Sequence, residues 1–124
     1  MTKSQSSGTE PKLCSRLRVL CGKEVALGPG RVDLLEHIDR TGTLRAAAAA
    51  MGMSYMRAWT LMKSLNDQFR KPLVVRVRGG KAGGGAVLTD TGKEVVMAYR
   101  RMERQSQAAI QSEWKELRDL LKSS

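Results

Sequence analysis

Two short helical patterns joined through a glycine constrain the fold of this chain more than any other feature of its 124 residues. The first pattern spans residues 43–51 and the second residues 54–69, and Thr43 and Ser54 are suitable N-caps. The apolar positions at helical spacing are Leu44, Ala47, Ala48 and Met51 in the first pattern and Ala58, Met62, Leu65 and Phe69 in the second. Five consecutive alanines allow the two helices to approach closely, and the turn at Gly52 sets their crossing angle. Residues 43–69 are therefore predicted to form a helix-turn-helix.

Smaller elements are predicted before this motif. Residues 1–12 are polar and bury little apolar surface, which predicts a disordered tail. Alternating side chains at residues 13–21 predict a half-buried strand, and residues 25–27 can pair back onto it before a Gly-Pro-Gly run ends the hairpin. Residues 31–40 place apolar side chains on one helical face, and Gly42 supplies a helix stop.

A second hairpin is predicted after the helix-turn-helix. Residues 73–77 are rich in valine, residues 87–88 form another β-like piece, and the loop GGKAGGGA lies between them. The basic residues proposed to contact DNA from this hairpin are Arg76, Arg78 and Lys81. A glycine-rich tip with basic strands is typical of a wing that lies along a DNA backbone or enters the minor groove. A nucleotide-binding loop is the competing interpretation, but the Walker pattern requires Ser or Thr after GK, and alanine follows here.

The last part of the chain predicts one long helix. Residues 93–122 contain neither glycine nor proline, and Thr89 or Thr91 can cap the helix. The apolar stripe of this helix consists of Val95, Val96, Tyr99, Met102, Ile110, Trp114, Leu117 and Leu121. A helix of this length needs a partner for its stripe, and dimerisation is predicted through Ile110, Trp114, Leu117 and Leu121.

The charge of the chain indicates a polyanionic partner. Lys and Arg number 22 against 12 Asp and Glu, which gives a formal net charge of +10 and an isoelectric point near 10.2. These values lie in the range of nucleic-acid-binding proteins. The alternative is that the charge serves solubility alone. Together with the helix-turn-helix and the wing, the charge favours double-stranded DNA as the partner.

The second helix of the motif carries the candidate base contacts. Its outward residues are Ser54, Tyr55, Met56, Arg57, Thr60 and Lys63. Arg57 can read guanine with two donors, and Tyr55 and Thr60 can bond phosphates or base edges. Met56 can touch a thymine methyl group, while Ser54 and the neighbouring amides suit a phosphate. The alternative for each residue is a solvated helix face.

Other classes of function find little support. His37 is the sole histidine, and no catalytic triad, carboxylate pair or metal cluster is evident, so we expect no enzyme activity, metal or cofactor. Cys14 and Cys21 are expected to be reduced and structural. No apolar run approaches the roughly 20 residues that a membrane span needs, and the first residues are unlike a signal peptide. We expect a cytoplasmic protein without membrane contact.

The run VALGPGRVDLLEHIDRTGTLRAAAAAMGMSYMRAWTLMKSLNDQF, followed by PLVVRVRGGKAGGGAVLTDTG, resembles the N-terminal DNA-binding domain of the ModE-type molybdenum-dependent transcriptional regulators. The similarity covers about residues 13–104, and its most specific part is GMSYMRAW followed by GGKAGGGAVLT. The resemblance implies a winged helix-turn-helix that dimerises with the help of its long helices and binds a palindromic operator. It marks Ser54, Tyr55, Arg57, Ala58 and Trp59 as the recognition-helix motif and residues 79–85 as the wing.

In the full-length family a pair of C-terminal molybdate-binding domains follows, and this sequence is expected to lack them because it ends at Ser124. Three possibilities stay open: regulation without a sensor, sensing by a separate molybdate-sensing protein, or a different ligand.

The combined prediction is a mainly α-helical fold with small β-hairpins, in which a winged helix-turn-helix precedes a long C-terminal dimerisation helix. Residues 1–12 form the tail, residues 13–88 the DNA-binding domain and residues 89–124 the helix. The predicted function is that of a homodimeric, sequence-specific repressor or activator of molybdenum-related genes. The alternative is an architectural, nucleoid-like protein that binds DNA without sequence preference.

Overall fold

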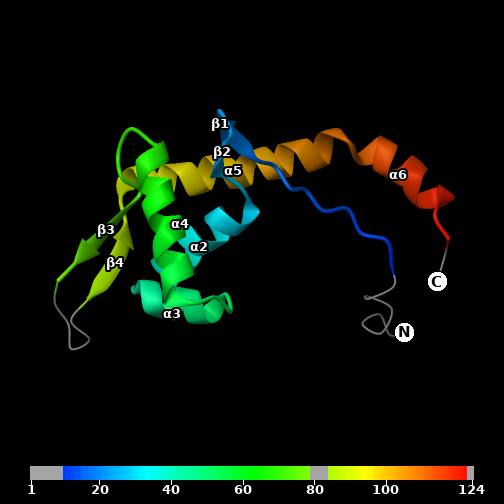
Figure 1. The fold of residues 1–124 in the computed structure, drawn as a ribbon. Helices are drawn as coiled ribbons and strands as arrows, with labels where there is room; N and C mark the ends of the chain where they lie inside the picture. Colours follow the sequence, from blue (N-terminus) through cyan, green and yellow to red (C-terminus); the bar gives the residue numbers. More distant parts are fainter. Residues whose placement is uncertain (1–9, 79–83, 123–124) are drawn as a thin grey trace. The chain divides into compact units, whose positions relative to one another are not determined.

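A computed structural model describes residues 10–78 and 84–122 of the chain (Figure 1). The chain divides into two compact units, one formed by Arg16–Arg100 and the other by Met1–Ser15 with Arg101–Ser124. Most of the predicted tail and the predicted wing tip, including Lys81, lie outside the described residues. No helix in the described part combines the length and apolar character needed to cross a membrane.

The helix predicted at residues 31–40 is α2, Pro29–Thr41. It begins two residues before the predicted start because proline at the first helical position has a suitable φ and lacks only an N–H that would be unpaired there. The predicted stop is confirmed, although the helix ends one residue later than residue 40: Gly42 adopts a left-handed φ of 83° and donates its N–H to the Ile38 carbonyl.

The helix-turn-helix consists of α3, Leu44–Ala50, and α4, Tyr55–Gln68. Each helix has the predicted cap: the Thr43 hydroxyl accepts the Ala46 N–H at 2.9 Å, and the Ser54 hydroxyl accepts the Arg57 N–H at 3.1 Å. The turn between them requires Gly52, whose φ is 68°. The local signals in the sequence therefore specified both helix starts correctly.

The first hairpin is shorter than predicted. Strand β1 covers Val19–Cys21 and pairs antiparallel with β2, Glu24–Leu27. The predicted strand at residues 13–21 is wrong for residues 13–18, which join no sheet because β2 offers only four residues for pairing. Burial still alternates along residues 13–18, with the odd-numbered side chains half-buried. Cys14 and Cys21 are free, as predicted, but both are exposed, so neither packs in the core.

The second hairpin is confirmed. Strand β3, Val74–Val77, pairs antiparallel with β4, Gly85–Leu88, which begins two residues before the predicted strand. The hairpin is joined to the end of α2, just before the helix-turn-helix, because the Ala86 N–H donates to the Gly42 carbonyl at 2.9 Å. This hairpin is the wing of the fold.

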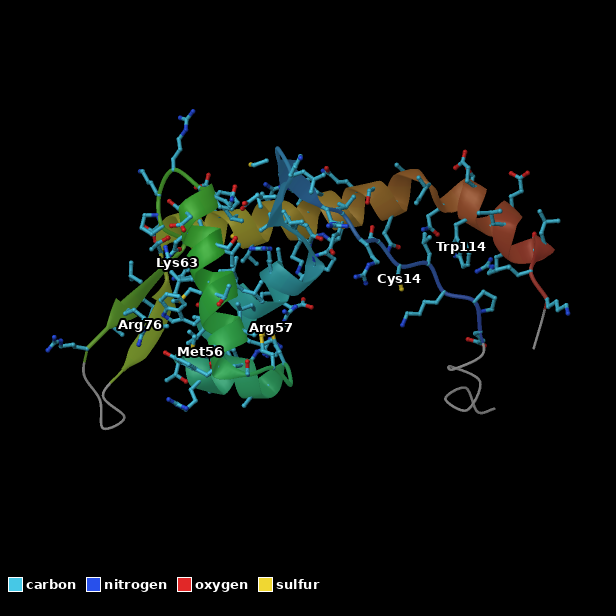
Figure 2. The ribbon with its side chains drawn as sticks, viewed as in Figure 1. Cys14, Met56, Arg57, Lys63, Arg76 and Trp114 are labelled. Atoms are coloured by element: carbon cyan, nitrogen blue, oxygen red, sulfur yellow. The ribbon has the colours of Figure 1, made fainter. Side chains whose placement is uncertain are left out.

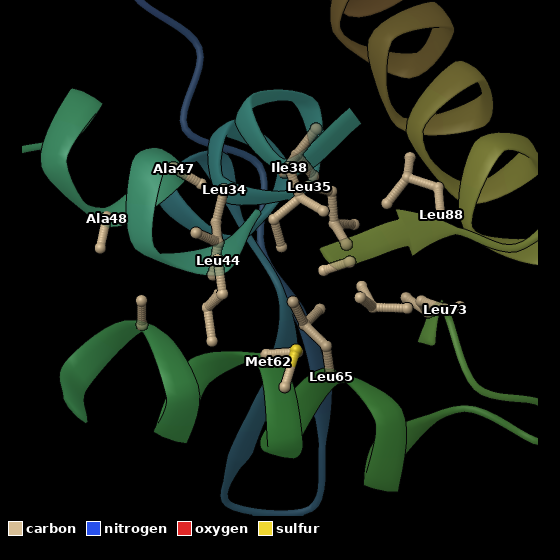
Figure 3. Packing of buried hydrophobic residues seen from close by; sticks show 14 of the residues in the cluster. Leu34, Leu35, Ile38, Leu44, Ala47, Ala48, Met62, Leu65, Leu73 and Leu88 are labelled. Carbon is tan, nitrogen blue, oxygen red and sulfur yellow. The ribbon is translucent and has the colours of Figure 1, made fainter. Parts of the chain in front are cut away.

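The core of the Arg16–Arg100 unit is almost entirely aliphatic, in keeping with an aromatic content of 4%. Figure 3 shows its centre, where side chains of α2, α3 and α4 meet those of the wing. The fully buried side chains of largest volume are Tyr99, Leu34, Leu35, Ile38, Leu65, Leu73 and Val32. The buried hydroxyl of Tyr99 is satisfied, since it donates to the Leu17 carbonyl at 2.8 Å.

Helix α5, Asp90–Ala109, begins where the wing ends. Thr89 caps it by accepting the Gly92 N–H at 2.9 Å, and the same hydroxyl donates to the Pro72 carbonyl at 2.8 Å. The Thr89 backbone N–H also donates to the Leu73 carbonyl at 2.9 Å. Thr89 thus joins the base of the wing to the first turn of α5.

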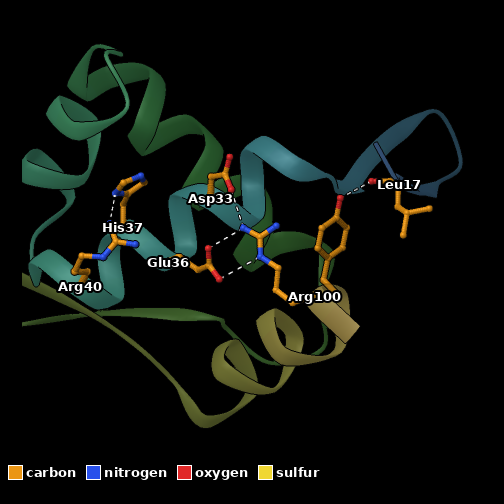
Figure 4. Close-up of polar contacts among 7 residues, drawn as sticks. Leu17, Asp33, Glu36, His37, Arg40 and Arg100 are labelled. Carbon is orange, nitrogen blue, oxygen red and sulfur yellow. Dashed lines mark hydrogen bonds and ion pairs between the residues drawn. The ribbon is translucent and has the colours of Figure 1, made fainter. Parts of the chain in front are cut away.

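An ion-pair cluster fixes α5 to α2 within the same unit (Figure 4). Arg100 donates to Asp33 and to Glu36, each at 2.7 Å through one guanidinium nitrogen, and to Glu36 again through Nε at 3.2 Å. The hydrogen bonds from Arg100 lower the pKa of Glu36 below its ordinary value. His37, in contrast, contacts Arg40 through Nδ1 at 3.1 Å.

The predicted single helix over residues 93–122 is wrong. Helix α5 ends at Ala109, Ile110 leaves the helical conformation with φ −112° and ψ 16°, and α6 covers Gln111–Leu120. The Gln107 carbonyl accepts the Ile110 N–H at 3.4 Å and the side-chain amide of Gln111 at 2.9 Å. A side chain that bonds into the helical ladder is a known cause of a kink, and no glycine or proline is needed.

Candidate nucleic-acid interface

The two faces of α4 differ sharply. Ala58, Met62 and Leu65 are buried against the core, whereas Met56, Arg57, Thr60 and Lys63 are exposed. Figure 2 shows Met56, Arg57 and Lys63 on α4 and Arg76 on the wing. Met56 is 64% exposed, an unusual position for a large apolar side chain. The structure therefore places these four predicted contact residues on the outer face of the helix.

The polar groups on this face keep hydrogen-bonding capacity for a ligand. The Thr60 hydroxyl donates to the Met56 carbonyl at 2.9 Å, which leaves its oxygen able to accept. Lys63 forms an exposed ion pair with Asp67 at 3.1 Å, and such pairs contribute only about 0.3–0.5 kcal/mol. A phosphate can therefore compete for Lys63 at small cost. Met56, Arg57, Thr60 and Leu61 together line a hollow of about 250 Å³.

Tyr55, predicted as an outward residue of the first turn of α4, is half-buried there. Its ring packs against the core and lies beneath the guanidinium of Arg45 on α3, 5.0 Å from the ring centre. Arg45 was not among the predicted contacts, although it is the sole charged residue in the α3 sequence LRAAAAA. That isolated charge on an alanine-rich helix was the available signal.

Arg45 and Arg76 line one hollow of about 210 Å³, which we call the Arg45–Arg76 hollow. Its other lining residues are Thr43, Leu44, Tyr55, Gly84 and Gly85. The hollow brings α3, the first turn of α4 and both wing strands together. Two arginines around a polar hollow are suited to bind a phosphate group.

The remaining wing residues fall into two groups. Arg76 and Arg78 are exposed, and no acidic side chain lies on β3 or β4. Lys81 lies outside the described residues, and its role in DNA contact stays a prediction.

The predicted dimerisation residues lie at or near α6. Leu117 is exposed on α6, Trp114 is half-buried with Arg118 over its ring at 5.9 Å, and Ile110 is in the break between the helices. Leu121 is exposed but follows the end of α6 in extended backbone, so it is not part of the helical stripe as predicted. Leu120, which the sequence reasoning missed, is the most exposed large apolar side chain described, at 78%.

Residues 30–93 match the family model of the bacterial regulatory helix-turn-helix proteins of the lysR family. This match covers more than half of the 124 residues and includes the helix-turn-helix and the wing. The chain belongs to this family. As a member of the lysR helix-turn-helix family, it has the predicted fold, a winged helix-turn-helix with two small antiparallel hairpins.

The chain is also similar to individual proteins whose names refer to molybdenum or to transcriptional regulation. The molybdenum transport protein ModE of Azotobacter vinelandii is 38% identical over 102 residues, which are 82% of this chain and 38% of the relative. The molybdenum-pterin-binding protein MopB of Rhodobacter capsulatus is 40% identical over 103 residues, or 83% and 38% of the two chains. The DNA-binding transcriptional dual regulator ModE of Escherichia coli K12 is 38% identical over 82 residues, or 66% and 31%.

The chain therefore spans less than two fifths of the length of these relatives. Its resemblance to the DNA-binding domain of ModE-type regulators is confirmed.

Proposed function

We propose that the chain is a sequence-specific DNA-binding transcriptional regulator in which α4 lies in the major groove. The observation that carries this proposal is that the first turn of α4 and the wing share one basic hollow. Tyr55 of α4 lines the Arg45–Arg76 hollow with Arg76, Gly84 and Gly85 of the wing, and the exposed residues Met56, Arg57, Thr60 and Lys63 follow Tyr55 along α4. A DNA backbone bound in this hollow would place α4 beside the base edges, and the wing would follow the same backbone.

The exposed residues of α4 divide into base-reading and phosphate-binding roles. Arg57 carries a planar guanidinium suited to the two acceptors of guanine, and Met56 offers an apolar contact for a thymine methyl group. Thr60 and Lys63 lie farther along the same face and contact base edges or phosphates. Tyr55 binds phosphate through its hydroxyl rather than reading a base, because its ring is held under Arg45. The Ser54 hydroxyl accepts the Arg57 N–H as the helix cap, which leaves its own O–H to donate to a phosphate oxygen.

The wing supplies contacts that do not depend on base sequence. Arg76 and Arg78 are exposed on and next to β3, and Lys81 follows them in the sequence. Each phosphate neutralised releases counterions, so these residues contribute affinity that falls as salt concentration rises.

The regulator acts as a homodimer in this proposal. Ile110, Leu117 and Leu121, with Trp114, provide apolar surface at α6 that a second copy would cover. Leu120 adds to the same surface. Two copies related by a two-fold axis would bind a palindromic operator.

The regulated genes are proposed to be related to molybdenum, because the relatives are named as molybdenum transport, molybdenum-pterin-binding and regulatory proteins. The role is that of a cytoplasmic DNA-binding protein with no enzyme activity and no cofactor of its own. Molybdate sensing by a separate protein stays a prediction.

Selection of bound duplexes from a random DNA pool tests the proposal. The enriched site and a scrambled duplex of equal length are then titrated at one salt concentration. We expect the enriched site to bind at least a hundredfold more tightly. Equal affinity for the two duplexes would reject the regulator in favour of the architectural alternative.

A pair of variants locates the base reader. Arg57→Ala should lose about 1–3 kcal/mol of binding to the enriched site, and its discrimination at one position should relax. Arg101→Ala is the matched control, since it removes one exposed arginine from α5.

A further inference from the structure

Four arginines line a cavity that is formed by the first hairpin, the start of α2 and helix α4. They are Arg16 and Arg18 before β1, Arg31 on α2 and Arg57 on α4. The cavity has a volume of about 330 Å³, and its remaining lining is Val25, Gly28, Pro29, Gly30, Met53 and Leu61. We call it the arginine cleft. It offers room for a small ion and several waters of about 30 Å³ each.

The positive charge of the arginine cleft is not balanced by an acidic residue in its lining. Within residues 10–78 and 84–122, no hydrogen bond or ion pair engages the guanidinium groups of Arg16, Arg18 and Arg57. Arg31 donates to the Ser64 hydroxyl at 2.9 Å. Burial lowers the pKa of Arg31, the repulsion from Arg57 lowers it further, and Glu24 opposes both from outside the lining. A bound anion would relieve this repulsion.

The first turn of α2 adds donors of the same kind. The N-cap of this 13-residue helix is Gly28, which has no side chain to accept a hydrogen bond from the first amides. Pro29 has no N–H, so the N–H groups of Gly30 and Arg31 are the uncapped donors next to the cleft. Such donors, together with the positive end of the helix dipole, favour an anion.

We propose that the arginine cleft is a binding site for a tetrahedral oxyanion of the phosphate class. The half-buried side chains of Val25, Met53 and Leu61 form the apolar part of its lining, and the arginines supply the charged donors. Two sources share this chemistry, a phosphodiester of the bound DNA beyond the bases that α4 reads, and a free oxyanion. Either would link an anion to operator binding, because Arg57 belongs both to the cleft and to the proposed reading face.

The inference extends the proposed DNA-binding function, and its test uses residues to which no base contact has been assigned. The variant Arg16→Gln/Arg18→Gln removes two exposed arginines from the cleft. Arg16→Lys/Arg18→Lys keeps the charge but loses the two-pronged donor geometry. The matched control, Arg101→Gln/Lys122→Gln, removes two exposed positive charges outside the cleft. Thermal unfolding checks that each variant folds like the parent chain.

Inorganic phosphate is the first probe, with the backbone amides of Gly30 and Arg31 followed by NMR. We expect a saturable shift in the parent and the control, and none in the glutamine variant. Operator binding between 50 and 200 mM salt is the second measurement. If a phosphodiester occupies the cleft, the negative slope of log K against log salt should become less steep by about 0.9 in the glutamine variant than in the control.

The two measurements separate the sources. A saturable phosphate shift without a change in slope identifies a free oxyanion site, and a change in slope without the shift identifies a DNA phosphate. If neither result appears, the proposal is overturned. If the parent chain shows no preference for its selected duplex, the proposed function fails while the phosphate titration still decides the cleft.

Discussion

Asn66 fastens helix α4 to the wing, and its replacement by alanine is expected to destabilise the fold strongly. Its side-chain oxygen accepts the N–H groups of Leu73 at 2.8 Å and Val74 at 3.1 Å. Its amide nitrogen donates to the Val74 carbonyl at 3.0 Å. One side chain thus satisfies three backbone groups at the start of β3.

The expected magnitude follows from these three bonds. A hydrogen bond of this kind contributes about 1 kcal/mol net, and a buried backbone group left without a partner costs about 1–3 kcal/mol. Because the Leu73 and Val74 side chains are buried, water has little access to their backbone groups after truncation. We therefore expect Asn66→Ala to lower the free energy of unfolding by about 3 kcal/mol, a large part of the total for a domain of this size.

Urea unfolding at one fixed protein concentration measures this loss, since stability depends on concentration if the protein dimerises. Asp67→Ala is the control, because it removes the neighbouring side chain from an exposed ion pair worth about 0.5 kcal/mol at most. Asn66→Asp keeps the two accepted bonds but sets a carboxylate oxygen against the Val74 carbonyl, so this variant should also be less stable than the parent chain. If Asn66→Ala falls within about 0.5 kcal/mol of the control, the Asn66 bonds do not hold α4 to the wing.

Three further predictions test the packing, the ion pairs and the proposed dimer. Gly92→Ala should destabilise the fold by at least about 1–3 kcal/mol in urea unfolding, because a Cβ there would overlap the Leu73 carbonyl; an unchanged midpoint would contradict this. The folded pKa of Glu36 is lowered by Arg100, so its stabilising effect should be present above the unfolded pKa of about 4.3 and be lost as pH falls through the folded value. Glu36→Gln should therefore flatten stability against pH in that range, and identical profiles would refute the assignment. A polar residue at Leu117, combined with one at Trp114, should give monomers by light scattering and weaker operator binding, whereas an unchanged mass would exclude this dimer surface.

The parts of the fold that were predictable are specified by local chemistry. Thr43, Ser54 and Gly42 act through bonds to their own neighbours in sequence, so the caps and the stop could be identified without tertiary information. The wing was equally predictable, because two valine-rich segments around a glycine-rich loop favour a β-hairpin over other structures. The outward face of α4 followed from the same helical periodicity that defined its buried face.

The parts that were missed depend on contacts between distant or competing groups. The predicted strand was wrong over residues 13–18, because alternating apolar side chains indicate which face is buried, whereas a strand also needs a partner strand of equal length. The helix break at Ile110 arises from a side-chain bond of Gln111 that no propensity scale contains. Arg45 and the arginine cleft were missed because their arginines come from separate elements that only the fold brings together.

Thr89 connects the wing directly to helix α5. It closes the base of the hairpin through Pro72 and Leu73 and caps α5 through Gly92. In mechanical terms the junction is a rigid coupling, so a displacement of the first turn of α5 must move the strand ends of the wing. The Asn66 bonds to Leu73 and Val74 start from the same strand end, so such a displacement would reach α4 together with the wing.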